Sequence, residues 1–215
     1  MTYGLPRPVA VGALLGEVAK DQVVLSSGVR PGDRIVLTKG VAIEGTAILA
    51  REAPDALRKA GVGANTVDRA REFLFSPGIS VVPDAGIACD VVQVHAMHDP
   101  TEGGLVTGLC ELATASDKGL CVYGERVPIF PETDALCEPF GIDPLRLIAS
   151  GALLIATPPS DADSIMAALR AKDIPVSSIA EVRPSSHGIT LEVSGREQAL
   201  VPADRDEIAK VFEAR

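Results

Sequence analysis

Eight residues near the middle of the chain combine groups that bind anions with groups that transfer protons. They are His98-Asp99-Pro100-Thr101-Glu102-Gly103-Gly104-Leu105, and they follow the apolar run 91–97. Asp99 is a suitable N-cap for a helix, and Pro100 would then occupy the first helical position. Two glycines in the first turn cost a helix about 1 kcal/mol each, so we expect them to let a ligand approach the backbone closely. The N-terminus of such a helix suits a phosphate or a carboxylate.

The same eight residues also allow a structural interpretation. A tight, well-capped turn between a strand and a helix would use both glycines without any ligand. His98 beside Asp99 could serve as an acid or base, although a lone histidine in a turn is more often a structural hydrogen-bond partner. The sequence therefore nominates His98, Asp99, Thr101, Gly103 and Gly104 as candidate ligand-binding residues.

A second glycine loop also follows an apolar run and opens a helical pattern. It reads Thr38-Lys39-Gly40-Val41-Ala42-Ile43-Glu44-Gly45-Thr46, with the G-x-x-x-x-G spacing of a P-loop. The Lys-Ser/Thr pair that a P-loop requires is replaced by Thr46-Ala47, which excludes that motif. Lys39, Gly40, Glu44 and Gly45 remain candidates for anion binding. Gly40 could instead be a turn residue, and for Lys39 we favour a solvated charge.

The sequence contains no motif for other common catalytic or metal-binding sites. The chain has no G-x-S-x-G elbow and no H-E-x-x-H motif. Its four cysteines, Cys89, Cys110, Cys121 and Cys137, form no C-x-x-C pair and no zinc-like spacing with the three histidines. We therefore predict no metal site, and free thiols in a reducing cytoplasm. His187, in a Ser-Ser-His-Gly turn, is expected at the tip of a hairpin.

Hydrophobic periodicity predicts the elements that position these loops. Helices are expected over 43–52, 65–75, from Asp99 to Lys118-Gly119, from a Ser160 cap to Lys172, and from Ala203 to the end. Strands are expected over 9–15, 35–38, 91–97, 120–123, 152–156, 177–182 and 189–193. The last two should form a hairpin. This order predicts one α+β domain over residues 1–215, a mixed sheet covered by helices as a three-layer α/β/α sandwich with partial ferredoxin-like topology.

Composition limits the classes of partner. The 215 residues are 47% hydrophobic, which is enough for a packed core, and their formal charge is −9. Binding to nucleic acid is not expected because it needs clustered lysine and arginine. No run approaches the roughly 18 apolar residues of a membrane span. A small anionic substrate stays possible, since it needs only a local positive site.

Four motifs in this order carry a family resemblance: residues 31–40, 43–50, the His98 to Leu105 stretch, and Leu147-Ile148-Ala149-Ser150-Gly151 followed by 152–155. Together they resemble the C-terminal domain of the aminoimidazole ribonucleotide synthetase superfamily. The nearest branch is the aminoimidazole ribonucleotide synthetase-related proteins, which are similar to a hydrogenase maturation factor. Selenophosphate synthetase and thiamine-monophosphate kinase are more distant relatives.

The resemblance implies a two-domain enzyme that uses Mg·ATP for phosphoryl transfer or ATP-driven dehydration. In that family the N-terminal domain carries the metal-binding aspartates, most of the ATP site and the dimer contact, while the C-terminal domain closes over the cleft. We expect that N-terminal domain to be absent from this chain, so Mg·ATP is expected only for an intact two-domain protein. The partner would be such a domain or a second subunit, and the chain itself a monomer or weak dimer.

Two departures bear on the reaction. The maturation factor usually has arginine at the position of Glu102, and it ends in a cysteine that carries the reacting group, whereas this sequence ends Phe212-Glu213-Ala214-Arg215. We therefore predict that the chain does not perform that reaction. Two hypotheses follow: a substrate-binding or lid domain that is inactive alone, and a stand-alone module that binds a small anion or a protein without catalysis.

Overall fold

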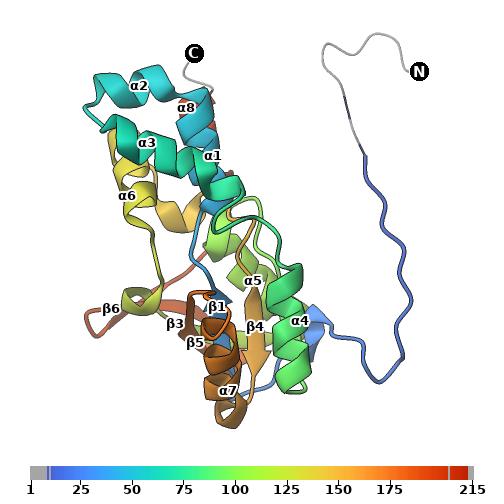
Figure 1. The fold of residues 1–215 in the computed structure, drawn as a ribbon. Helices are drawn as coiled ribbons and strands as arrows, with labels where there is room; N and C mark the ends of the chain where they lie inside the picture. The colour runs from blue at the N-terminus through green and yellow to red at the C-terminus, as the bar shows by residue number, and fades with distance from the viewer. Residues whose placement is uncertain (1–8, 10, 203, 213–215) are drawn as a thin grey trace.

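The fold is seen in a computed structural model that describes residues 9, 11–202 and 204–212 (Figure 1). The strands are β1 (Arg34–Thr38), β2 (Ala96–His98), β3 (Lys118–Tyr123), β4 (Leu154–Thr157), β5 (Val176–Pro184), β6 (Ile189–Val193) and β7 (Arg196–Ala199). The helices are α1 (Ile43–Glu52), α2 (Pro54–Lys59), α3 (Ala64–Arg71), α4 (Val82–Val91), α5 (Gly104–Ser116), α6 (Pro131–Cys137), α7 (Pro159–Arg170) and α8 (Ala209–Phe212). Short 3-10 turns connect several of them, including η1 (Ser26–Gly28), η2 (Glu72–Leu74), η5 (Pro144–Arg146) and η6 (Ser185–His187).

One mixed sheet organises the described part of the chain. Its strand order is β2-β4-β1-β5-β3-β6-β7, and all pairs are antiparallel except β3 with β6. Strands β4 and β5 both run antiparallel to β1, so the β4–α7–β5 unit is a crossover that spans β1. This split β-α-β unit is the ferredoxin-like part of the topology.

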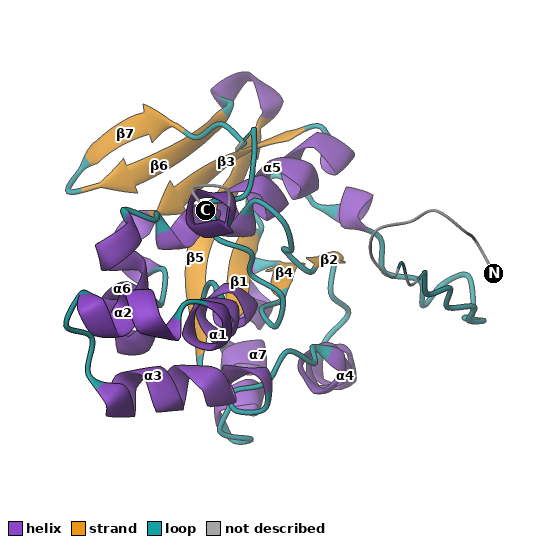
Figure 2. Ribbon diagram, turned by 90° about the horizontal axis from the view of Figure 1, so that it is seen from above, coloured by secondary structure: helices purple, strands orange, loops and turns teal. Residues whose placement is uncertain are grey.

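The sheet separates two hydrophobic cores. Along β1, Ile35 and Leu37 enter the larger core, which also contains the apolar face of α5, whereas Val36 enters a smaller core with α7 and α4. Such alternation follows from the period of two in a β-strand. Helices therefore cover both faces of the central strands, which confirms the predicted α+β class with its α/β/α layers. Helices α1, α2, α3 and α6 gather at one end of the sheet in both views (Figures 1 and 2).

Several elements agree with the sequence patterns. Helix α1 has the predicted bounds of 43–52, and β6 has the predicted bounds of 189–193. The 65–75 pattern becomes α3 and η2, and the 120–123 strand lies inside β3. These segments have strong, unbroken periodicity, so local sequence alone identifies them.

Two predicted strands are wrong in whole or in part. Among the described residues of 9–15 no strand forms, and their side chains are exposed, since they face no neighbouring element that would bury an apolar face. The run 91–97 forms a strand only from Ala96, and the preceding segment Val82–Val91 is the unpredicted helix α4. Its proline lies in the first turn, where helices tolerate proline.

The predicted hairpin between 177–182 and 189–193 is also wrong. Strands β5 and β6 do not pair with each other, because β3 lies between them and pairs with both. The hairpin partner of β6 is β7, which the sequence did not predict. His187 therefore lies in a 3-10 turn that crosses the end of β3 and is not a hairpin tip.

Helix ends differ from the predictions where the backbone is left-handed. Helix α5 begins at Gly104 and not at Asp99. Gly103 and Gly104 have φ of 75° and 68°, and this left-handed backbone prevents a right-handed helix from running through them from residue 99. It ends at Ser116, because Asp117 takes the left-handed conformation. The predicted stop, Lys118-Gly119, already belongs to β3.

Two further ends need correction. Ser160 does not cap α7; its hydroxyl donates to Asp161 Oδ1 at 3.0 Å. The last helix is confined to Ala209–Phe212, and Ala203 and 213–215 lie outside the described residues. None of the helices in the described residues has the length and apolar character needed to cross a bilayer.

Candidate functional site

A third segment, residues 145–151, joins the two candidate loops, and we call it the bridging segment. The backbone N–H of Gly45 donates to Ile148 O at 3.1 Å. One residue further along, the N–H of Ala149 donates to Thr101 O at 3.2 Å. The bridging segment is thus hydrogen-bonded to both loops, so positions 45 and 101, far apart in sequence, flank the same stretch of chain. Its residues 147–151 form the first part of the fourth motif that carries the family resemblance.

Close packing against the bridging segment explains two of the glycines. A Cβ atom on Gly45 would overlap the side chain of Leu147 and lie 2.9 Å from Ile148 O. A Cβ atom on Gly104 would lie 2.6 Å from Leu145 O and 2.7 Å from Leu147 O. Gly45 and Gly104 therefore allow close packing against the bridging segment, which supports the interpretation that the glycines in these turns have a structural role. Contact with a ligand stays a prediction.

Lys39 is not the solvated charge that the sequence favoured. Its residue is only 5% exposed, and its ammonium donates to Ser80 O at 2.7 Å and to Gly151 O at 2.9 Å. It also forms an ion pair of 3.2 Å with the buried carboxylate of Asp84. With three oxygens around Nζ, this cation fixes the end of the bridging segment to α4 and is committed to protein groups.

Gly40, Ala42 and Glu44 lie at or just before the start of α1. Gly40 lies against Phe130, whose ring carbon would be 2.7 Å from a Cβ atom at that position. Ala42, at φ of 55°, is the N-cap of α1 without a side-chain cap. Glu44 is half-buried in the first turn, where its negative charge interacts favourably with the helix dipole.

The N-terminus of α5 already holds a carboxylate. The backbone N–H of Gly103 donates to Asp206 Oδ2 at 2.6 Å, and the other oxygen of Asp206 accepts the N–H of Ile208 at 2.9 Å. The predicted cap, Asp99, is exposed and does not bond the first turn. The helix end therefore donates to a carboxylate of the same chain, and binding of an anionic ligand there stays a prediction.

His98 and Thr101 both precede this turn in the sequence. His98 Nε2 lies 2.9 Å from Glu111 Oε2, and its Nδ1 lies 3.5 Å from the Ser26 hydroxyl. The imidazole is thus held by α5 and η1, which fits a structural hydrogen-bond partner. Thr101 is half-buried, and its carbonyl accepts the N–H groups of both Gly104 and Ala149. Its neighbours in sequence, Asp99 and Glu102, are both exposed.

Sequence patterns missed two residues of this region. Asp84 neutralises Lys39 from a distance of 45 positions, and Asp206 reaches Gly103 from 103 positions away. Neither shares a motif with its partner, so no local pattern connects them. For Asp84, the one signal in the sequence is a carboxylate in the first turn of a mainly apolar segment that also contains Asp90.

Comparison with known proteins decides the family. A family model described as the C-terminal domain of AIR synthase related proteins matches residues 30–192, which is most of the chain and includes both loops and the bridging segment. The chain belongs to this family. The matched residues contain all four motifs and strands β1 to β5, and they end inside β6, so β7 lies outside the match.

Individual relatives agree with the family match. The chain is 31% identical over 156 residues to a carbamoyl dehydratase HypE from Cupriavidus necator. The aligned region covers 73% of the chain and 41% of that relative. A crystal structure of the hydrogenase maturation protein HypE in complex with ATP has a TM-score of 0.65 at 23% identity, covering 90% of the chain and 57% of that structure.

A thiamine-monophosphate kinase from Stenotrophomonas maltophilia K279a has the same fold, with a TM-score of 0.58 at 18% identity over 84% of the chain and 56% of that protein. The chain thus spans about two fifths of the curated relative and somewhat more than half of these solved structures. The predicted resemblance to the hydrogenase maturation branch is confirmed, as is the fold.

Proposed function

We propose that this AIR synthase-related domain is the substrate-binding or lid domain of an ATP-dependent enzyme and is inactive alone. The observation that carries the proposal is the bridging segment, which holds the Gly45 and Thr101 loops together as one surface. In the proposal, this surface closes over a nucleotide or anionic substrate held by another domain or a second subunit. The ATP-bound and kinase relatives support an ATP-linked role.

The charges around the loops define how the surface would meet a phosphate. Lys39 is neutralised by Asp84, and the exposed carboxylates of Asp99 and Glu102 repel anions. The N–H groups of Gly45, Gly103 and Gly104 already donate to groups of the same chain. In the proposal, a phosphate is therefore contacted through the Thr101 hydroxyl, with Mg²⁺ shielding its charge. In this proposal, the magnesium ligands come from the domain that holds the nucleotide, as the family resemblance implies.

A thermal-shift and calorimetric titration with ATP, ADP and phosphate, each with and without Mg²⁺, tests the proposal. A ligand present at 100 times its Kd stabilises a fold by about 2.7 kcal/mol, a shift that is readily measured. We expect no stabilisation of the isolated chain by Mg·ATP and no release of phosphate. Hydrolysis of ATP by the purified chain would refute its proposed inactivity, and magnesium-dependent stabilisation that disappears in Thr101→Ala would assign part of the nucleotide site to this domain.

A second candidate function is a stand-alone module that binds a small anion. It is favoured by the Asp206 carboxylate on the Gly103 N–H, which shows that the α5 end accepts an oxyanion. Replacing Asp206 by Asn would remove the competing charge, so phosphate should then bind more tightly than to the parent chain. Asp163→Asn, an exposed carboxylate on α7, is the matched control. Equal phosphate affinity in all three proteins would exclude this function.

A further inference from the structure

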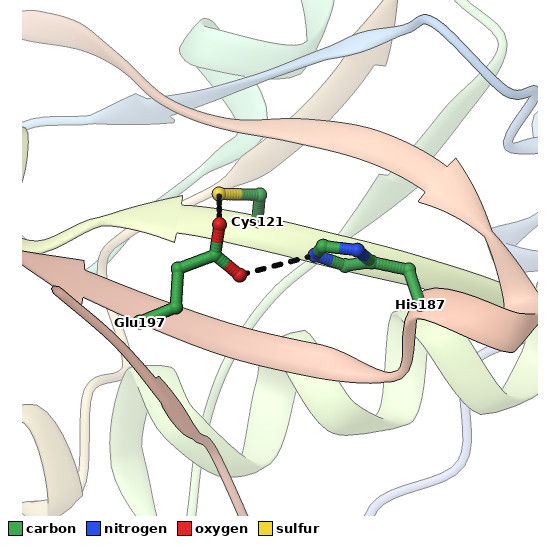
Figure 3. Close-up of side chains that lie close together, drawn as sticks. All are labelled: Cys121, His187 and Glu197. Carbon is green, nitrogen blue, oxygen red and sulfur yellow. Dashed lines mark hydrogen bonds and ion pairs between the residues drawn. The ribbon is translucent and has the colours of Figure 1, made fainter. Parts of the chain in front are cut away.

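Three side chains with metal-binding atoms converge on the outer face of the sheet, away from both candidate loops. They are Cys121 on β3, His187 in η6 and Glu197 on β7 (Figure 3). Figure 3 shows Glu197 between the other two, with one carboxylate oxygen directed toward each. The Cys121 thiol lies 4.0 Å from Glu197 Oε1, and His187 Nε2 lies 3.5 Å from Glu197 Oε2.

These distances are close to the edges of a metal coordination polyhedron. With Zn–S near 2.3 Å and Zn–N or Zn–O near 2.0–2.2 Å, the ligand atoms of a tetrahedral zinc site are about 3.3–3.6 Å apart. In the structure, the ligand atoms of all three residues lie within 4.8 Å of one another. The histidine–glutamate distance already fits, and the other ligand–ligand distances need to shorten by at most about 1.2 Å.

The strands fix two of the three ligands. Cys121 lies between Leu120 and Val122, which both enter the main core, so the period of two directs its thiol to the opposite face. Its residue is only 3% exposed, while the side chains of His187 and Glu197 are 31% and 45% exposed. A cation held here would thus have a buried ligand beneath it and an open position toward water.

The charges of the neighbourhood are compatible with a divalent cation. A thiolate and a carboxylate together neutralise two positive charges, and the imidazole binds as a neutral ligand. Glu192 adds negative charge near Cys121, whereas the nearby Arg183 is paired with Glu181 at 3.1 Å. The hydroxyl of Thr190 lies 3.2 Å from His187 Nε2, a contact that orients the ring in the absence of metal.

We propose that Cys121, His187 and Glu197 form a site for a zinc-like divalent cation with one coordination position left to water. The donor set of sulfur, nitrogen and oxygen suits Zn²⁺ or Co²⁺ and excludes a preference for Mg²⁺, which takes oxygen ligands. The residues are far apart in sequence and match no metal motif, which is why sequence analysis predicts no site. The proposal shares no residue with the proposed function and stands or fails separately from it.

The test is titration of the full 215-residue chain with Co²⁺ under anaerobic conditions, followed by displacement with Zn²⁺. One equivalent of Co²⁺ should give the near-ultraviolet absorption of a thiolate–cobalt bond, and Zn²⁺ should remove it. Magnesium in large excess should leave this band unchanged. Cys121→Ser should abolish the band, and Glu197→Gln and His187→Gln should weaken Zn²⁺ binding by at least about tenfold.

Two control variants make the result specific. Cys89→Ser removes an exposed cysteine elsewhere, and Glu192→Gln removes a carboxylate that lies near Cys121 without being a ligand. Both should bind Zn²⁺ within about twofold of the parent chain. Absence of a cobalt–thiolate band in the parent chain, or its loss in Cys89→Ser, would overturn the proposal. Should Cys121→Ser fail to fold, the exposed His187→Gln variant decides the outcome, because parent-like zinc affinity there refutes the site.

Discussion

Replacing Gly104 by alanine should destabilise the domain through two separable effects. A left-handed conformation costs a non-glycine residue about 1–2 kcal/mol. The new Cβ atom would also lie 2.6 Å from Leu145 O and 2.7 Å from Leu147 O, backbone atoms that can move only if the bridging segment shifts. Such overpacking costs about 1–3 kcal/mol, so the total loss of unfolding free energy should be about 2–5 kcal/mol.

Gly141 supplies the matched control for this substitution. It has φ of 60°, close to the 68° of Gly104, but its added Cβ atom would meet nothing within 4 Å. Gly141→Ala should therefore cost only the conformational part, about 1–2 kcal/mol. Any stabilisation that alanine gives by restricting the unfolded chain is common to both variants and cancels in their difference.

Urea denaturation of the two variants and the parent chain measures the difference directly. We expect Gly104→Ala to be less stable than Gly141→Ala by about 1–3 kcal/mol, with unchanged m values. In a chain of this length, each kcal/mol corresponds to about 2–4 °C in Tm. Equal stabilities would show that the bridging segment does not pack tightly on Gly104 and would refute the packing role assigned to this glycine.

Three further predictions concern the Lys39–Asp84 ion pair, the Asp206 carboxylate and the buried thiol of Cys137. Lys39→Met should lower the free energy of unfolding by about 3–5 kcal/mol, because it leaves Asp84 buried and unpaired. Combining Lys39→Met with Asp84→Leu should recover most of this loss. A small effect of Lys39→Met alone in urea denaturation would contradict the prediction. Asp206→Asn should cost about 1 kcal/mol in the same assay, since it removes the charge from the bond to the α5 N-terminus, and unchanged stability would count against that bond. Burial raises the pKa of the Cys137 thiol to about 12, with nearby carboxylates adding to the shift, so at pH 8 only about one thiol in 10,000 is ionised. Mass spectrometry after brief alkylation of the folded chain should then find Cys89 modified and Cys137 intact, and rapid modification of Cys137 would be inconsistent with its burial.

Local patterns predicted several of the elements correctly, whereas the pairing of the strands depends on contacts between residues far apart in sequence. Helix α1 follows directly from a 3.6-residue period, and the alternation in 189–193 gives β6. The position of β6 depends on β3, which lies between β5 and β6 and pairs with both. This pairing joins segments far apart in sequence, so the residues next to β6 do not predict it. A two-strand hairpin was therefore the natural but wrong inference from a short turn.

In the candidate site, too, the sequence predicted local backbone features but not the contacts between distant residues. The glycine pair at 103 and 104 signalled a special turn, and the structure has left-handed backbone at both positions. What occupies that turn could not be predicted, because Asp206 reaches it from the far end of the chain. The charge of Lys39 was likewise visible in the sequence, whereas its neutralisation by Asp84 requires the three-dimensional packing of α4.

The bridging segment has a consequence for how this region exchanges its amide protons with solvent. The N–H groups of Gly104 and Ala149 share one acceptor, Thr101 O, and the N–H of Gly45 bonds the neighbouring Ile148 O. The bonds of Ala149 and Gly45 break when residues 145–151 lift away from the two loops, and the same movement uncovers Gly104, which packs against Leu145 O and Leu147 O. Their exchange should consequently report one opening free energy, so the two loops form a single cooperative unit in which protecting one also protects the other.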